Sequence, residues 1–404
     1  MSRATVRVEV PGDSLFGPEN MPYGIFAPPG GEFRVGVRLG EFVLDLAVLL
    51  DDPAFAQPDL NSFLAQGPTS WRVVRERLRE LADSPLPAEA VHAFDSIRTA
   101  LPVRIGDYVD FYASLDHATN LGRLFRPDAE PLLPNWRHLP VGYHGRAGTV
   151  VVSGTPVVRP CGQRRTDSGA PEFGPSRRLD IEAELGFVVG TASRQGEPVS
   201  VDDFGDHVFG VALVNDWSAR DIQAWEYQPL GPFLGKSFAT SLSAWITPLA
   251  ALARARVPLP PQEPEPLPYL LGTDDHGFDI DLAVTWNGET VSRPPYARMY
   301  WSPAQMLAHL TANGASIRPG DLYASGTISG PERDQRGSFI ELSWGGIEPV
   351  TVGDAPHTFL TDGDEVTITA TAPGTAGRPI GLGAVGGTIL AAHEPGPQEF
   401  RSAG

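Results

Sequence analysis

The sequence of 404 residues contains a single cysteine, Cys161, and no apolar run long enough to cross a membrane. One cysteine excludes an intrachain disulfide and a cysteine-rich metal site, and it is typical of a reducing compartment. A membrane-spanning helix needs about 18 to 20 apolar residues, and the first residues, MSRATVRVEV, lack the apolar core of a secretory signal. We therefore expect a cytoplasmic protein with no membrane partner, in which Cys161 is a buried spectator.

Basic residues are also scarce. Lys and Arg number 31 against 49 Asp and Glu, which gives a net charge of -18. Nucleic acids and anionic membranes are bound through a basic surface, so this balance argues against both as partners. Part of the excess negative charge is available to bind cations.

The remaining composition is that of a folded protein with many turns. Hydrophobic residues make up 41% of the chain and charged residues 20%, which is typical of a globular protein. The 44 glycines and 40 prolines are dispersed, and this favours a mainly β architecture. A chain of 404 residues favours two domains over one.

Local patterns predict several elements. Alternating residues predict strands over 33–39 and 42–46, and a helical pattern covers 70–81. Residues 279–286 and 289–292 predict a hairpin around Asn287-Gly288, and a capped helix is expected from Pro303 to Asn313. The segment GLGAVG at 381–386 matches a dinucleotide-binding fingerprint, but too little chain follows it. We interpret it as chance or as tight strand packing.

A row of carboxyl groups lies on the predicted strand from Leu179 to Val189. Side chains alternate across a strand, so Asp180, Glu182 and Glu184 share a face, with neighbours roughly 6.5 to 7 Å apart. The apolar run that follows is typical of an interior strand, and interior carboxylates need a counter-charge, for which a hard cation is the simplest choice. The pattern leaves a metal site and a solvated acidic face both open.

A second polar segment follows the apolar run at 208–214. It carries the residues Asp216, Arg220, Asp221, Gln223, Glu226, Tyr227 and Lys236. Catalytic groups are often found where a strand ends in a loop. The segment GPFLGKS at 231–237 is not a phosphate-binding loop, because three residues separate its glycines where that motif needs four.

The segment DYVDFYASLDHATN contains a candidate general base. Ser114 is a plausible N-cap for a helix running towards Phe125, which places His117 in the first turn. A helix N-terminus disfavours the imidazolium form, so His117 there stays neutral and able to accept a proton. A structural histidine is the alternative, and the nearby tyrosine, carboxylate and arginine residues favour the base.

Two further segments carry isolated polar groups. His138 and His144 on a loop rich in glycine and proline lack a helical zinc spacing, so we interpret them as turn residues, while Tyr143 is a candidate ligand contact. The segment SFIELSW predicts a strand that places Glu341 between apolar neighbours. A buried carboxylate needs a partner, and His117 is one candidate.

Taken together, several segments closely resemble the fumarylacetoacetate hydrolase family, in its fumarylacetoacetase branch. They are DFYASLDHATN, PNWRHLPVGYHGRA, LDIEAE, VNDWSARDIQAWEYQPLGPFLGKSF, RPGDLYASGTISGPE and DGDEV, with PYGIF and GEFVLDLAVL near the N-terminus. The resemblance implies a mainly β (α+β) fold, with a small SH3-like barrel over residues 1–101 and a larger mixed β-roll catalytic domain over residues 102–404 that forms a homodimer. It also implies hydrolysis of a carbon-carbon bond in a small β-diketo acid, fumarylacetoacetate, giving fumarate and acetoacetate in the last step of tyrosine and phenylalanine degradation.

The resemblance also implies a metal centre for Ca²⁺ or Mg²⁺. Its ligands match Asp110, Glu182, Glu184 and Asp216, which leaves Asp180 as a supporting residue. A second ion is implied near Asp216 and the turn from Lys236 to Thr240, where Lys236 contributes through its carbonyl because an ammonium cannot be a ligand. This turn carries Ala239 where the family usually has glycine. The extra methyl group is a departure from the family pattern in the turn that would bind the second ion.

The catalytic groups are carried over in the same way. His117 matches the base that activates water and Glu341 the carboxylate that orients it. The groups around the developing negative charge match Arg220, Gln223 and Lys236. Substrate contacts match Tyr112, Arg126, Tyr143, Gln223, Tyr227 and Thr327.

Two other functions compete with this one. A related acylpyruvate hydrolase, decarboxylase or isomerase would keep the metal carboxylates with a different catalytic histidine, so His117 with Glu341 favours the hydrolase described above. A metal-dependent binding protein without turnover would need neither Lys236 nor Arg220, because chelation requires only the carboxylates.

Overall fold

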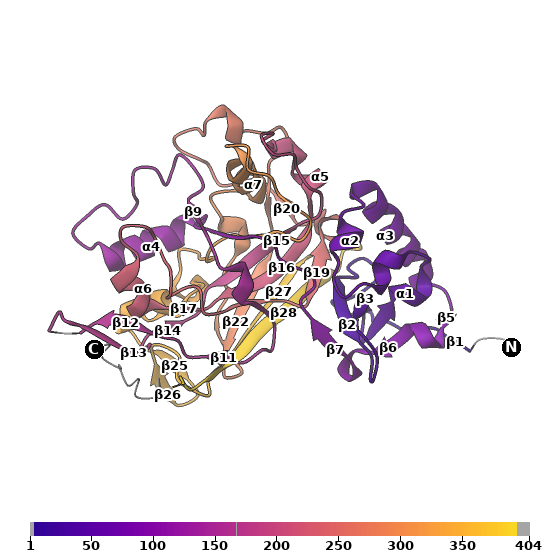
Figure 1. Cartoon of the computed structure of the whole chain (residues 1–404), viewed down its shortest axis with the longest axis horizontal. Coiled ribbons are helices and arrows are strands. Elements are labelled where there is room, and N and C mark those ends of the chain that lie inside the picture. Colours follow the sequence, from indigo (N-terminus) through magenta and orange to yellow (C-terminus); the bar gives the residue numbers. More distant parts are fainter. Residues whose placement is uncertain (1–3, 167, 394–404) are drawn as a thin grey trace, which may run out of the picture.

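A computed structural model describes residues 4–166 and 168–393 of the chain (Figure 1). Strands dominate it, and the predicted mainly β class is confirmed. The largest sheet is mixed and has thirteen strands: β2 (Tyr23–Ala27), β3 (Arg34–Leu39), β4 (Phe42–Asp45), β6 (Val91–Ala93), β7 (Arg98–Ala100), β8 (Tyr108–Phe111), β9 (Gly142–His144), β10 (Val150–Val152), β15 (Ala183–Val189), β16 (Val208–Asp216), β18 (Thr240–Leu242), β19 (Trp245–Pro248) and β24 (Leu322–Ala324).

A five-stranded sheet lies beside the large one. It contains β11 (Val157–Val158), β22 (Asp281–Trp286), β23 (Glu289–Ser292), β27 (Glu365–Pro373) and β28 (Pro379–Leu390). Five two-stranded ribbons complete the strands of the described residues: β1 (Thr5–Val6) with β5 (Leu86–Pro87), β12 (Cys161–Arg165) with β13 (Pro171–Pro175), β14 (Leu179–Asp180) with β17 (Ser218–Ala219), β20 (Arg256–Val257) with β21 (Gly277–Phe278), and β25 (Val350–Val352) with β26 (Ala355–His357). The GLGAVG segment lies within β28, which agrees with strand packing.

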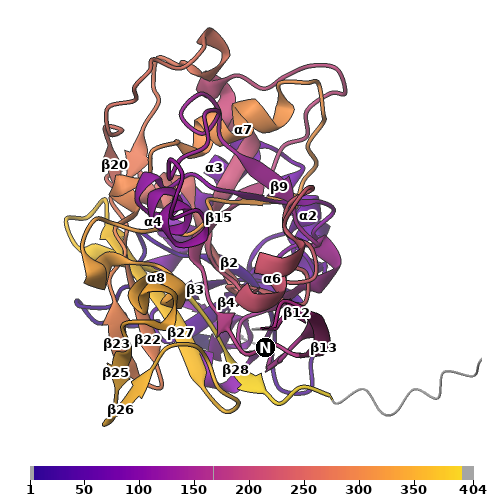
Figure 2. The same cartoon turned by 90° about the vertical axis from the view of Figure 1, so that its left-hand side faces the viewer.

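Helices cover the ends and edges of these sheets. Those in the described residues are α1 (Leu46–Leu49), α2 (Asn61–Leu64), α3 (Pro68–Ala82), α4 (Leu115–Phe125), α5 (Phe204–His207), α6 (Arg220–Glu226), α7 (Pro303–Thr311) and α8 (Phe339–Leu342). None of them is long and apolar enough to span a lipid bilayer. Figure 2 shows α4 and α6 on either side of β15.

The predicted elements at 33–46, 70–81, 279–292 and 303–313 are confirmed. They correspond to β3 with β4, α3, β22 with β23, and α7. The α7 helix begins with a capping box, in which Ser302 accepts from the backbone of Gln305 and the Gln305 side chain accepts from the backbone of Ser302. The side-chain oxygens thereby satisfy backbone N–H groups that the first turn leaves without partners.

The N-terminal strands run into the large sheet. In the described residues their order is β6-β4-β3-β2, with β7 also on β2, and β2 then pairs with β19. Gly24 lies opposite Trp245 in this pairing, and a β-carbon at Gly24 would come within 2.5 Å of the carbonyl oxygen of Ala244. The close approach joins the two parts of the sheet, and the strands described here do not close into a separate barrel.

The centre of the large sheet is formed by β16, β15, β24 and β8. Every residue of β15 and β16 is buried, as expected for an interior apolar run. The two strands are antiparallel and pair Ala183 with Asn215, so β15 starts where β16 ends. On the other side of β15, Ala324 of β24 lies between Gly186 and Asp110 of β8. Acidic residues on three central strands therefore meet near one end of these strands.

Two predicted elements are wrong. The expected strand from Leu179 to Val189 is interrupted at Ile181 and Glu182, because β14 pairs with β17 whereas β15 pairs with β16 and β24. The segment SFIELSW forms the short helix α8 instead of a strand. Its first backbone N–H groups, those of Phe339 and Ile340, donate to the carboxylate of Asp180 at 2.7 and 3.1 Å. A cap from a distant residue thus overrides the local strand propensity.

Candidate active site

Four carboxyl groups from different parts of the sheet converge in the interior. Their residues are Asp110 on β8, Glu182 just before β15, Glu184 on β15 and Asp216 at the end of β16. All four are buried, and one oxygen of each lies within 4.8 Å of the others. Oxygen donors in this arrangement are the ligands that hard divalent cations prefer. The solvated acidic face considered as an alternative is therefore excluded for these residues.

Two members of the cluster lack hydrogen bonds that buried carboxylates normally require. Within the described residues, neither oxygen of Glu184 nor Oδ1 of Asp110 has a hydrogen-bond partner. Burial, with the neighbouring carboxylates, raises the pKa of both groups well above the ordinary range. Unpartnered buried oxygens are costly unless a cation coordinates them. The cluster is therefore suited to a divalent cation, which its four carboxyl groups would hold.

Lys236 occupies the opposite side of the cluster. Its Nζ donates to Oδ2 of Asp216 at 2.7 Å and to Oε2 of Glu182. Burial alone would raise the pKa of Glu182, but Lys236, Arg220 and His117 outweigh it and lower that pKa. Glu182 is therefore the carboxylate of the cluster that is most firmly held in its ionised form.

Arg220 links the cluster to a fifth buried carboxylate. Its Nη1 lies 2.8 Å from Oε1 of Glu182, and its Nε donates to Oδ2 of Asp180 at 2.7 Å. The Oε1 of Gln223 accepts from the same Nη1 at 3.1 Å, while Nη2 is buried without a partner. Asp180 does not join the four clustered carboxyl groups, because its oxygens are taken by Arg220 and by the backbone of α8. The two N–H groups of Nη2 thus remain available to a ligand.

His117 lies against the cluster in the first turn of α4. Ser114 is the N-cap and accepts from the backbone N–H of His117 at 3.2 Å, as the sequence predicts. The Nδ1 of His117 lies 2.6 Å from Oε2 of Glu341, and its Nε2 lies 3.9 Å from Oε1 of Glu182. A carboxylate can only accept, so Nδ1 carries the proton in the neutral imidazole and Nε2 faces the cluster unprotonated.

Three residues that the sequence analysis missed hold Glu341 in place. Asn120 donates to Oε1 at 3.0 Å, and Ser329 and Ser338 donate to Oε2 at 3.0 and 2.7 Å. Burial would raise the pKa of Glu341, but the His117 imidazole and these donors lower it. Asn120 lies one helical turn after His117 and was detectable from that spacing, whereas nothing in the sequence near Ser329 indicates its role.

Two of the predicted substrate contacts, Tyr112 and Tyr143, touch residues of this site. The ring of Tyr112 packs edge-on against the His117 imidazole with centroids 5.3 Å apart. The hydroxyl of Tyr143 donates to Asp216 at 3.1 Å, and the hydroxyl of Thr327 is buried without a partner. A cavity of about 310 Å³ opens beside Tyr143 and Lys236. Of the three residues, Tyr143 lines this cavity, so its hydroxyl is positioned to meet a polar ligand there.

Arg126 and Tyr227 lie at the ends of α4 and α6, farther from the cluster. Nη2 of Arg126 donates to the carbonyl of Pro131 at 2.8 Å, and its Nε is buried without a partner. Tyr227 stacks on Phe125 with centroids 6.2 Å apart. The contact between Tyr227 and Phe125 connects the ends of α6 and α4.

The turn after Lys236 also contacts the cluster. Oγ1 of Thr240 donates to Oδ1 of Asp216 at 3.0 Å, and Ala239 is buried beside it. His138 and His144 are exposed, as expected for turn residues. His144 faces Asp107 at 3.5 Å instead of the cluster.

Two family models match almost the whole chain. The model described as fumarylacetoacetase N-terminal matches residues 19–108, and the one described as fumarylacetoacetate (FAA) hydrolase C-terminal matches residues 108–389. The chain belongs to the fumarylacetoacetate hydrolase family. Relatives within the family include the fumarylacetoacetase of Rattus norvegicus, 46% identical over 96% of this chain and 99% of that protein, and that of Arabidopsis thaliana, 42% identical over 95% and 97%.

Solved structures of low sequence identity share the fold. A fumarylacetoacetate hydrolase from Exiguobacterium antarcticum superimposes with a TM-score of 0.57 at 17% identity, over 92% of this chain and 99% of that one. A maleylpyruvate hydrolase from Sphingobium sp. SYK-6, solved in complex with manganese(II) and pyruvate, gives a TM-score of 0.53 at 17% identity, over 92% and 100%. The family fold thus extends to relatives of low sequence identity.

Proposed function

We propose that the chain hydrolyses fumarylacetoacetate to fumarate and acetoacetate, with His117 as the general base. The observation that carries the proposal is the position of the imidazole, whose Nδ1 is fixed by Glu341 and whose Nε2 faces the carboxylate cluster. Full-length fumarylacetoacetases that are 42 to 46% identical to this chain support the substrate.

His117 would take a proton from water at Nε2. Since Nδ1 donates to an ionised Glu341, the positive charge that develops on the ring is stabilised by that carboxylate. The water is directed to the carbonyl next to the fumaryl group of the substrate. The imidazolium is then the nearest acid for the carbanion that leaves.

Two cations are available to the negative charge that develops on the carbonyl oxygen. The free Nη2 of Arg220 is one donor, and the ammonium of Lys236 is the other. Donors of this kind contribute about 10² to 10³ in rate each. Gln223 holds the guanidinium of Arg220 on the side towards the cluster.

The four carboxyl groups would hold Ca²⁺ or Mg²⁺, and such an ion polarises the carbonyls of a β-diketone and stabilises the enolate that leaves. Asp110 and Glu184, whose oxygens have no other partner, support this assignment. We also expect a second ion beside Asp216, held by Thr240 and the Lys236 carbonyl, and the contact between Thr240 and Asp216 supports it. Tyr112, Tyr143 and Thr327 would contact the substrate, and Arg126 with Tyr227 would hold a terminal carboxylate.

We also propose a location, an oligomeric state and a division into domains. We expect a cytoplasmic homodimer with an N-terminal domain over residues 1–101 and a catalytic domain over residues 102–404. Leu230 is 96% exposed, Phe233 60% and Leu234 46% on the loop after α6, and a group of exposed apolar side chains is typical of an interface. Light scattering during gel filtration would measure the oligomeric state.

The ultraviolet absorbance of fumarylacetoacetate tests the function directly. The purified chain should remove the absorbance and release fumarate and acetoacetate in equal amounts. A chelator should stop the reaction, and added Ca²⁺ or Mg²⁺ should restore it. An acylpyruvate serves as the comparison substrate, and faster turnover of it than of fumarylacetoacetate would overturn the assignment.

A further inference from the structure

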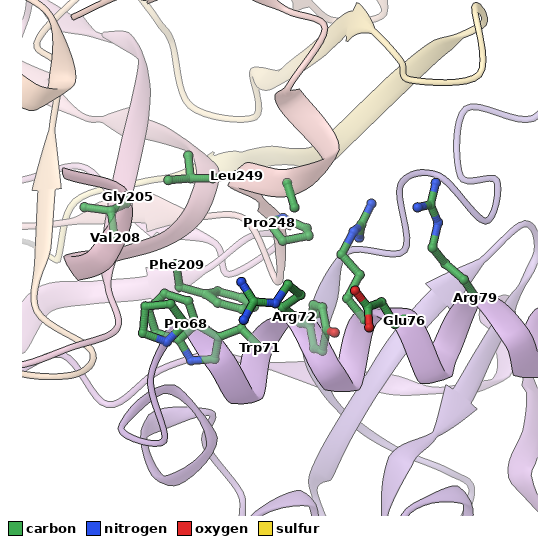
Figure 3. A pocket seen from close by; sticks show the side chains of 13 residues that line it. Pro68, Trp71, Arg72, Glu76, Arg79, Gly205, Val208, Phe209, Pro248 and Leu249 are labelled. Atoms are coloured by element: carbon green, nitrogen blue, oxygen red, sulfur yellow. The ribbon is translucent and has the colours of Figure 1, made fainter. Parts of the chain in front are cut away.

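A separate cavity of about 330 Å³ lies between α3 and the opposite end of β16 (Figure 3). One wall is α3, and the other is formed where α5 leads into β16 and by Pro248 to Ala250 after β19. None of the residues placed in the active site lines it. Phe209, near the start of β16, faces this cavity, whereas Asp216 at the end of the same strand belongs to the carboxylate cluster.

The floor of the cavity is aromatic. Phe209 makes edge-on contacts with Tyr23 and with Trp71, with ring centroids 5.3 Å apart in both pairs. The indole N–H of Trp71 already donates to the carbonyl of Leu64 at 3.0 Å. The backbone at Gly190 approaches the same ring so closely that a β-carbon there would lie 2.4 Å from it. The aromatic floor is therefore held in place and offers an apolar surface.

The wall formed by α3 is basic. Arg72, Arg75 and Arg79 line the cavity together with one acidic residue, Glu76. This is a local reversal of sign in a chain of net charge -18. Arg75 is buried and donates to the backbone carbonyls of Asn20 and Glu19, so its charge is fixed in the wall.

Arg72 and Arg79 are both available to a ligand. In Figure 3 Arg72 lies beside Trp71 and Phe209, Glu76 follows it along α3, and Arg79 lies farther along the same helix. Both arginines are exposed, and within the described residues neither takes part in an ion pair or a side-chain hydrogen bond. Guanidinium groups bind carboxylates through paired hydrogen bonds.

We propose that this cavity binds a small monocarboxylate with an aromatic or branched apolar body. The carboxylate binds Arg72, which lies beside the aromatic floor, and the body rests on Trp71 and Phe209. Arg79 adds positive charge two helical turns further along α3. A volume of about 330 Å³ is at the lower end of the range for small-molecule sites and suits a single ring with a short acidic chain. Glu76 disfavours ligands of higher negative charge, such as nucleotides.

A ligand in this position bridges the N-terminal and C-terminal parts of the chain. It contacts α3 on one side and the segment after β19 on the other. Because it binds only the folded protein, it stabilises the fold in proportion to its concentration over its dissociation constant. Thermal unfolding is therefore a readout that does not depend on turnover.

The probe is 3-phenylpropionate, and its neutral amide is the control ligand. Calorimetric titration and thermal unfolding should show that the acid binds and raises the unfolding temperature, while the amide does neither. The double substitution Arg72→Gln with Arg79→Gln should weaken binding of the acid by at least about tenfold. Arg77→Gln, on α3 but outside the cavity and paired with Glu80, should leave it unchanged.

Two results would overturn the proposal. One is equal binding of the acid and the amide, and the other is unchanged binding of the acid to the double variant. Turnover of fumarylacetoacetate by the double variant shows that it is folded. Binding that survives in the double variant and is displaced by substrate would place the acid in the active site instead.

Discussion

The carboxylate of Asp180 accepts a hydrogen bond of 2.7 Å from the backbone N–H of Phe339, the first residue of α8. The same carboxylate accepts from Nε of Arg220 at 2.7 Å. Asp180 is fully buried. Its carboxylate joins Arg220 of the active site to α8, the helix that carries Glu341. Asp180, which is outside the carboxylate cluster, thus positions both Arg220 and the helix of Glu341.

Asp180→Asn should lower turnover by about 100-fold, the usual effect of a small displacement of catalytic groups. The substitution replaces one acceptor oxygen by an amide, so Arg220 and α8 can no longer both keep their bonds. Calorimetric binding of Ca²⁺ or Mg²⁺ should change little, because Asp180 is not among the clustered carboxyl groups. Asp281→Asn, at an exposed position of β22, is the control, and an equal loss of metal binding in the Asp180 variant would contradict the prediction.

His117→Ala should reduce turnover by about 10² to 10⁴, the range typical of a general base. The imidazole faces the cluster but is not one of its oxygen ligands, so metal affinity should be retained. Steady-state kinetics and metal titration on the same preparation separate the two effects. His138→Ala, at an exposed histidine, should behave as the wild type. Full activity without His117 would remove it as the base.

Glu184→Gln should abolish tight metal binding and yet stabilise the protein in the presence of a chelator. Without a cation, both oxygens of Glu184 are buried without partners, and burial raises its pKa well above the ordinary range. A raised pKa in the folded state contributes stability that is lost as the pH rises. The advantage of the variant in chelator should therefore grow from acid to neutral pH. Urea unfolding of both proteins, with chelator and with Ca²⁺, measures it, and a variant less stable than wild type in chelator at neutral pH would disagree.

Asp275 should make stability depend on pH far from the active site. Burial raises its pKa to about 6. Because the folded pKa lies above the unfolded value, stability falls as the pH rises from about 4 to 6, by at most about 3 kcal/mol. Asp275→Asn should be more stable than wild type at pH 7 and should lose this advantage near pH 4. Chemical unfolding across this range is the test, with Asp51→Asn at an exposed position as the control.

Short-range patterns in the sequence predicted many elements correctly. The apolar run at 208–214 lies in β16, where every residue is buried, and Ser114 caps α4 and places His117 in its first turn. These features depend on side-chain alternation and on capping, which act over a few residues. The resemblance to the family identified which four carboxyl groups come together, and the structure places these four in one cluster.

The helical conformation of α8 and the role of Asp180 as its cap were visible only in the tertiary structure. Local propensity indicated a strand through Glu341, but the cap on this segment comes from a residue 159 positions away. The donors that hold Glu341 are similarly scattered, with Asn120 lying 221 positions from it. A single sequence carries no signal for such pairings, because they arise only when the fold brings β14 and α4 against α8. The sequence by itself therefore determined the local elements and the kinds of chemical group, and packing of the sheet decided which groups face one another.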